Sequence, residues 1–175
     1  MLYMARHGQT VWNVNNRVCG ITDVELTEKG KEQAKALAYE VGCKDINLII
    51  TSPLKRAVET SQIVSAICNI PFKIDERLIE QNYGIYEGID RKNEDFLINK
   101  RCFAFKYPNG ESIMQVAYRI YGLMDEIKCE YRDKNVLVIS HGGVCRVINT
   151  YFRDMTNDEF FDYSLENAKL EEYEW

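Results

Sequence analysis

Three short apolar runs, each ending abruptly in a polar or glycine-containing turn, constrain the fold of this chain most strongly. They span Leu2–Ala5, Asn47–Thr51 and Asn135–Ser140, and helical patterns separate them. Short apolar runs of this length predict buried strands, and strands that alternate with helices predict a parallel sheet. We therefore expect an α/β fold, with three α/β/α layers around a largely parallel central sheet.

Four stretches carry the signals of helices. Thr27 is a good N-cap and Gly42 a good C-cap for the first stretch. Ser52 as N-cap, with Pro53 at the first helical position, predicts the start of the second helix. Apolar residues at helical spacing predict the other two helices, over Ile113–Tyr131 and Val144–Arg153.

A less apolar strand is expected over Phe72–Leu78, near an edge of the sheet. We interpret the chain as one domain, 1–175, with a small cap over about 84–108 inserted after this third strand in the sequence. The aromatic stretch Phe96–Tyr107 either covers part of a site or forms a satellite hydrophobic cluster. Residues 168–175 are expected to add an edge strand.

Composition is that of an ordinary globular protein, with 28% charged and 46% hydrophobic residues and a net charge of -5. Lysine and arginine are dispersed, which argues against nucleic acid as a partner. No run approaches the roughly 18 to 20 apolar residues of a membrane helix. Without a visible export signal, and with six cysteines that form no Cys-x-x-Cys pair, we expect a cytoplasmic protein with reduced thiols and no metal site.

Two histidines and two arginines occupy equivalent positions at the predicted strand ends. His7 and His141, the only histidines, each follow a strand and precede a glycine, while Arg6 and Arg56 lie at or just after strand ends. In a parallel sheet these ends share one edge, where open α/β folds bind ligands. Arginine matches phosphate oxygens by bidentate hydrogen bonding, and helix N-termini add N–H groups. The pattern predicts a pocket for a tetrahedral dianion.

Other kinds of phosphate chemistry lack their motifs. The sequence contains no Gly-x-x-x-x-Gly-Lys-[Ser/Thr] loop, no Gly-x-Gly pair, no cysteine followed by arginine six residues later and no Asp-x-Asp pair. Those absences argue against a P-loop, a cysteine phosphatase loop and an aspartyl-phosphate site. Histidine is then the remaining candidate nucleophile.

Five motifs, in order, resemble those of the histidine phosphatase superfamily, which includes the cofactor-dependent phosphoglycerate mutases. They are Arg6-His7-Gly8-Gln9-Thr10-x-Trp12-Asn13, Ser52-Pro53-Leu54-Lys55-Arg56-Ala57, Glu80 with Tyr83-Gly84, Pro108-Asn109-Gly110-Glu111-Ser112 and Ser140-His141-Gly142-Gly143. The resemblance covers most of the chain. Because the motifs span so much of it, the whole chain is expected to share the fold of that superfamily.

What the resemblance implies is a covalent mechanism without a metal or other cofactor. A ring nitrogen of His7 attacks phosphorus, Glu80 acts as acid and then as base, and Arg6, Arg56 and His141 stabilise the phosphoryl group. Glu87, the competing acid, is interpreted as bracing its loop. Phosphate or substrate contacts are implied for eight residues: Arg6, Asn13, Gly20, Ile21, Arg56, Tyr83, His141 and Gly142.

Family members differ in whether the phosphoryl group goes to water or back to a sugar acid. Mutases carry a longer insertion, whereas only nineteen residues separate Gly88 from Pro108 here. Asn82 replaces a histidine that is usual in mutases, although Arg91 and Lys92 are placed to contact a substrate carboxylate. We favour a phosphatase acting on small phosphate esters, with a mutase or a noncatalytic phospho-ligand binding protein as alternatives. Substrate and oligomeric state stay open.

Overall fold

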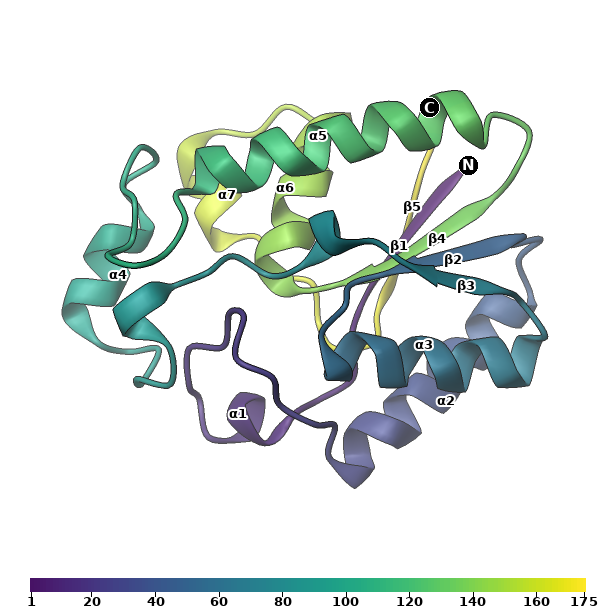
Figure 1. Cartoon of the computed structure of the whole chain (residues 1–175), viewed down its shortest axis with the longest axis horizontal. Helices are drawn as coiled ribbons and strands as arrows, with labels where there is room; N and C mark the ends of the chain where they lie inside the picture. Colours follow the sequence, from purple (N-terminus) through teal and green to yellow (C-terminus); the bar gives the residue numbers. More distant parts are fainter.

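The computed structural model describes residues 1–175, and a five-stranded sheet in the order β3-β2-β4-β1-β5 forms its centre (Figure 1). Four strands run parallel: β1 (Leu2–Arg6), β2 (Leu48–Thr51), β3 (Phe72–Ile74) and β4 (Val136–Ser140). β5 (Leu170–Tyr173) pairs with β1 in the antiparallel direction and closes the far edge. The expected α/β fold with a largely parallel sheet is confirmed, and β3 lies at an edge as predicted.

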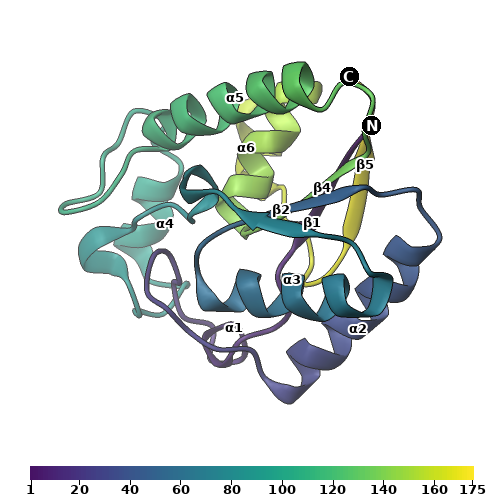
Figure 2. The same cartoon turned by 45° about the vertical axis from the view of Figure 1, so that its right-hand side comes forward.

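Helices cover both faces of this sheet, as Figures 1 and 2 show. α2 (Glu28–Gly42) and α3 (Lys55–Cys68) lie on one face. α5 (Ile113–Glu130), α6 (Gly142–Phe152) and α7 (Asn157–Asp162) lie on the other. Side chains of a strand alternate between faces. Leu2 and Met4 therefore join one core with α5 and α6, and Tyr3 and Ala5 join the other with α2 and α3.

Four shorter elements connect the layers: α1 (Val11–Val14), the 3₁₀ turns η1 (Glu76–Leu78) and η2 (Gly84–Tyr86), and α4 (Glu94–Lys100). The segment from η2 through α4 lies to one side of the sheet in Figure 1. Its aromatic rings pack as a small cluster of their own, in which Tyr83, Phe96 and Tyr107 are buried together with Val18. The satellite cluster interpreted from Phe96–Tyr107 is therefore present.

The start of α3 differs from the prediction. The helix begins at Lys55 with Leu54 as N-cap, and not at Pro53 with Ser52 as N-cap. Leu54 is extended (φ -70°, ψ 137°), and Asp23 Oδ1 accepts the Lys55 N–H at 2.8 Å. The Ser52 Oγ accepts the Leu54 N–H at 3.3 Å and lies 2.6 Å from the His141 Nε2. Ser52 therefore fixes the turn before α3 and contacts the second histidine at the same time.

Three other boundaries also shift. Gly42 is the last residue of α2, and the cap is Cys43. The predicted strand Phe72–Leu78 ends at Ile74, because the Asp75 side chain caps the turn η1 by accepting the Arg77 N–H. α6 begins at Gly142, two residues earlier than predicted, directly after the end of β4.

Candidate active site

The two histidines lie together because the strands before them end at the same level. Arg6 on β1 pairs in register with Ser140 on β4, and the His7 N–H donates to the Ser140 carbonyl at 3.0 Å. His7 and His141 thus leave adjacent strands at one edge, and their ring centroids are 5.1 Å apart. Chain segments separated by more than a hundred residues therefore meet at the predicted place.

Hydrogen bonds set the tautomer of His7. Its Nδ1 lies 2.7 Å from the Gly8 carbonyl oxygen, which can only accept, so Nδ1 carries the proton. The Arg56 Nε–H points at Nε2 from 3.2 Å, which requires Nε2 to be the acceptor. The Gly8 N–H in turn donates to Thr60 Oγ1 at 3.1 Å and fixes this turn on α3. The imidazole is held with its basic nitrogen at Nε2.

Burial and positive neighbours keep this imidazole neutral. Burial, followed by the charges of Arg56 and Arg6, holds the pKa of His7 well below its usual range. The same causes, burial first and Arg56 next, lower the pKa of His141. A neutral histidine keeps a lone pair on one ring nitrogen and is competent as a nucleophile. In His7 this lone pair is on Nε2 and faces the Arg56 Nε–H.

Arg56 joins the two histidines to the loop that precedes α2. It is 1% exposed, and its Nε–H points at both His7 Nε2 and His141 Nδ1, the latter at 3.1 Å. Its other nitrogens donate to the carbonyls of Thr22 (2.9 Å) and Gly20 (2.6 Å). Because every nitrogen of this guanidinium is hydrogen-bonded, it is a fixed positive group beside the Nε2 of His7.

Arg6 presents an unused donor at the same edge. Its Nε is the one buried side-chain nitrogen or oxygen of the protein without a hydrogen-bond partner, although another nitrogen of the same group donates to the Leu165 carbonyl at 2.9 Å. A Cβ at Gly142 would lie 3.7 Å from this Nε. Gly142 opens α6, where no helical carbonyl accepts its N–H. An unpaired charged donor beside a helix N-terminus is the arrangement that binds anions.

Glu80 is held at the edge of this anion site by two backbone N–H groups. Its carboxyl oxygens accept from Gln81 N and from Gly143 N, each at 2.9 Å. Gly143 has to be glycine for this approach, since a Cβ there would lie 2.6 Å from Glu80 Oε1. The carboxyl group is thus fixed against the first turn of α6.

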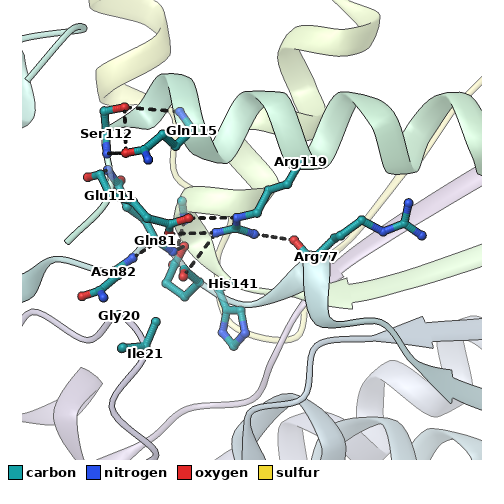
Figure 3. Close-up of polar contacts among 12 residues, drawn as sticks. Gly20, Ile21, Arg77, Gln81, Asn82, Glu111, Ser112, Gln115, Arg119 and His141 are labelled. Carbon is teal, nitrogen blue, oxygen red and sulfur yellow. Dashed lines mark hydrogen bonds and ion pairs between the residues drawn. The ribbon is translucent and has the colours of Figure 1, made fainter. Parts of the chain in front are cut away.

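Arg119 of α5 braces the backbone that carries Glu80, and Figure 3 shows its contact with Arg77. Arg119 donates to the carbonyl oxygens of Arg77 and Glu80 and pairs with the Glu111 carboxylate at 3.2 Å. Glu111 also accepts the Asn82 N–H at 3.0 Å. One ion pair thus ties the loop that carries Glu80 to the long helix.

A cavity of about 170 Å³ opens at this edge. Six of the residues implied by sequence line it, namely Arg6, His7, Asn13, Glu80, Tyr83 and Gly142. Asn13 uses Oδ1 to accept the Thr10 N–H at 3.0 Å, and its Nδ2 makes no hydrogen bond of its own. The cavity is smaller than the roughly 300–1,000 Å³ of drug-sized ligand sites, so it suits a small ligand.

The other implied residues lie outside the cavity lining. Arg56 and His141 are buried next to His7 and do not line the cavity. The N–H groups of Gly20 and Ile21 both donate to the Glu87 carboxylate at 3.0 Å, so these two residues are bound to the protein itself. Glu87 braces this loop, as interpreted from the sequence. Direct contact of Arg56, His141, Gly20 and Ile21 with a ligand stays a prediction.

Several cavity-lining residues were missed by the sequence argument. They come from α6 and from the end of α7 and the residues after it: Arg146, Phe161, Asp162, Tyr163 and Ser164. Arg146 had a usable signal, because it follows Gly142 by four residues and so shares its face of α6. The others come from segments whose place beside His7 depends on the tertiary fold.

Two further properties concern metals and membranes. No three His, Cys, Asp or Glu side chains come together as a group that could hold a metal ion. The helices include none with the length and apolar character needed to cross a bilayer.

Comparison with known proteins places this site in a family. The sequence model of the histidine phosphatase superfamily (branch 1) matches residues 2–175. Phosphoserine phosphatase 1 of Hydrogenobacter thermophilus is 28% identical over 95% of this chain and 82% of its own length. The 2,3-bisphosphoglycerate-dependent phosphoglycerate mutase 2 of Gloeobacter violaceus is 34% identical over 85% of this chain and 73% of its own.

The fold agrees with solved structures as well. A mycobacterial glucosyl-3-phosphoglycerate phosphatase in complex with VO3 superposes with a TM-score of 0.85 at 29% identity, covering 97% of this chain and 90% of the other. The chain belongs to the histidine phosphatase superfamily, branch 1. Its relatives are named both as phosphatases and as phosphoglycerate mutases.

Proposed function

We propose that this protein is a phosphomonoesterase that hydrolyses small phosphorylated metabolites through a phosphohistidine intermediate on His7. The observation that carries the proposal is the state of this residue: a buried, neutral imidazole with its proton on Nδ1 and its lone pair on Nε2. The phosphatase names among the relatives also support it.

In the first step, Nε2 of His7 forms a bond to phosphorus while the bond from phosphorus to the ester oxygen breaks. Glu80 gives its proton to the departing oxygen, so the alcohol leaves neutral. The Arg6 Nε–H and the Gly142 N–H lie where the phosphoryl oxygens gather charge. Arg56 and His141 stabilise the phosphoryl group, since the Arg56 Nε–H lies 3.2 Å from Nε2, the atom that attacks phosphorus, and 3.1 Å from His141 Nδ1.

In the second step, water attacks phosphorus and the bond to Nε2 breaks. The Glu80 carboxylate takes the proton of that water, and inorganic phosphate leaves. The protein returns to its starting protonation, with no electron transfer and no co-reactant other than water. Proton transfer of this kind contributes about 10²–10⁴-fold to rate.

A second candidate is phosphotransfer between two hydroxyl groups of a phosphoglycerate. It uses the same first step, and a relative that is 34% identical carries the mutase name. Arg91 lines the cavity, whereas Lys92 is exposed and lies outside it. The short segment between Gly88 and Pro108 favours the phosphatase, because a mutase needs cover that keeps water from the phosphohistidine.

Hydrolysis of 4-nitrophenyl phosphate by the wild-type protein and by His7→Ala, both in excess EDTA, tests the proposal. Turnover by the wild type alone, with unchanged circular dichroism for the variant, supports a metal-independent histidine phosphatase. Equal turnover by both proteins would contradict it. Conversion of 3-phosphoglycerate to 2-phosphoglycerate, without release of phosphate, would favour the mutase.

A further inference from the structure

The cavity beside His7 holds more positive charge than one phosphate group requires. Four cationic side chains line it: Arg6, Arg91, Lys100 and Arg146. None of them takes part in any of the ion pairs of the protein. Of the two lining carboxyl groups, Asp162 is already paired with Arg101 at 2.7 Å, which leaves only Glu80.

Lys100 is the least satisfied of these cations. It is the last residue of α4, half-buried, and its ammonium group makes no hydrogen bond and no ion pair. Burial, then the positive charges of Arg146, Arg91 and Arg101, lowers the pKa of Lys100 to about 8, and Asp162 offsets this only in part. Holding an unpaired ammonium there is costly, and a bound anion would remove that cost.

Arg146 lines the cavity one turn of α6 beyond Gly142 and is fixed in place. It is only 9% exposed, donates to the Tyr163 carbonyl at 3.0 Å, and lies over the Phe160 ring. It follows Gly142 by four residues in α6, which is about 6 Å along the helix axis. Arg146 is thus about one helical turn from Gly142, whose N–H is proposed to bind the phosphoryl group.

We infer that Lys100 and Arg146 form a subsite for a second anionic group, a carboxylate or another phosphate, carried by the alcohol part of the substrate. The inference rests on the proposed function and narrows its substrates to phosphate esters with two separated anionic groups. The spacing of one helical turn suits an alcohol of two or three carbons, and Phe96 and Tyr163 are aromatic residues of the same lining.

Three substrates with one carbon skeleton test the subsite. Glycerol 3-phosphate carries a hydroxymethyl group at the far carbon, 3-phosphoglycerate carries a carboxylate, and glycerol 1,3-bisphosphate carries a phosphate. We expect the wild type to prefer at least one of the two doubly anionic esters over glycerol 3-phosphate by about tenfold or more in kcat/KM, the effect of one charge-assisted hydrogen bond. Which of them it prefers identifies the second group.

Lys100→Gln is the matching variant, with Lys92→Gln, an exposed lysine outside the cavity, as its control. We expect Lys100→Gln to lower kcat/KM for the preferred ester about tenfold more than kcat/KM for phenyl phosphate, which has no second anionic group. Lys100→Arg should restore much of the preference. Equal kcat/KM for all three esters in the wild type, or equal losses on every substrate in Lys100→Gln, would overturn the inference.

Calorimetric binding separates this inference from the proposed function. Should the wild type hydrolyse nothing, the proposed function fails, yet affinities of the same three esters still report the subsite. Tighter binding of a doubly anionic ester, lost in Lys100→Gln and kept in Lys92→Gln, would support the subsite in a protein that binds without catalysis. Equal binding of all three would contradict it.

Discussion

The Nδ1 of His7 lies 2.7 Å from the carbonyl oxygen of Gly8, and this contact decides which ring nitrogen is reactive. A carbonyl cannot donate, so the proton stays on Nδ1 and the lone pair on Nε2. The turn is fixed by close packing, because a Cβ at Gly8 would lie 2.3 Å from the Gly30 carbonyl oxygen on α2. The glycine after the histidine is therefore required for the orientation of the imidazole.

Stability should fall in acid because of the two buried histidines. Folding lowers the pKa of His7 and His141 below 6.5, so the unfolded chain binds more protons below that pH and stability decreases as pH falls. Each histidine contributes up to about 1.4 kcal/mol per pH unit in that window. The free energy of unfolding, measured with urea between pH 8 and pH 5, should fall less steeply with decreasing pH for His7→Gln than for the wild type. Identical slopes would mean that folding does not lower the pKa of His7, contrary to its burial beside Arg56.

Gly143→Ala should displace Glu80 and lower turnover. The new Cβ would lie 2.6 Å from Glu80 Oε1, so the carboxyl group has to move. We expect kcat for glycerol 3-phosphate or 3-phosphoglycerate to fall by about 10²-fold, the loss of one general acid. Gly122→Ala is the control: nothing lies within 4 Å of its Cβ, and the exchange should stabilise α5 by about 0.5–1 kcal/mol. Unchanged kinetics in Gly143→Ala would contradict this placement of Glu80.

Arg119→Lys tests whether the Arg119 brace positions Glu80. Lysine cannot bridge the Arg77 and Glu80 carbonyls while pairing with Glu111. We expect kcat to fall about tenfold for esters with poor leaving groups and to stay near normal for 4-nitrophenyl phosphate. Arg132→Lys, at an exposed position, serves as the control. A loss shared by all substrates would indicate a purely structural role for Arg119.

Glu80→Gln should distinguish leaving groups in the same way and more strongly. An amide cannot give up a proton, so alkyl phosphates should slow by about 10²-fold or more, while 4-nitrophenolate leaves without help. Asp162→Asn is the comparison, because Asp162 also lines the cavity but pairs with Arg101. If Asp162→Asn and not Glu80→Gln produced the leaving-group effect, the acid would be Asp162.

The strands and the meeting of the histidines were predictable from the sequence. Apolar runs such as the one within Asn135–Ser140 specify buried strands, and parallel strands bring the residues after them to one edge. The proximity of His7 and His141 could therefore be predicted from their positions in the sequence alone. The contact between Ser52 and His141 was not predictable. A Ser-Pro pair predicts an N-cap, and only the tertiary structure shows that the Ser52 hydroxyl contacts His141.

Lys100 falls in the predicted cap, but the sequence could not show that its side chain lines the cavity. Next to it, Arg101 pairs with Asp158 and Asp162 of α7. Residues about sixty positions apart make these contacts, and no local pattern encodes them.

The most direct test of the account is the position of the phosphoryl group in the trapped intermediate. Wild-type protein mixed with substrate and quenched in base, under which phosphohistidine survives, can be examined by ³¹P and ¹⁵N NMR with His7→Ala as the control. We predict a phosphoryl group on Nε2 of His7, absent from the variant. A phosphoryl group on Nδ1 or on any other residue, or turnover without a phosphoenzyme, would contradict the account.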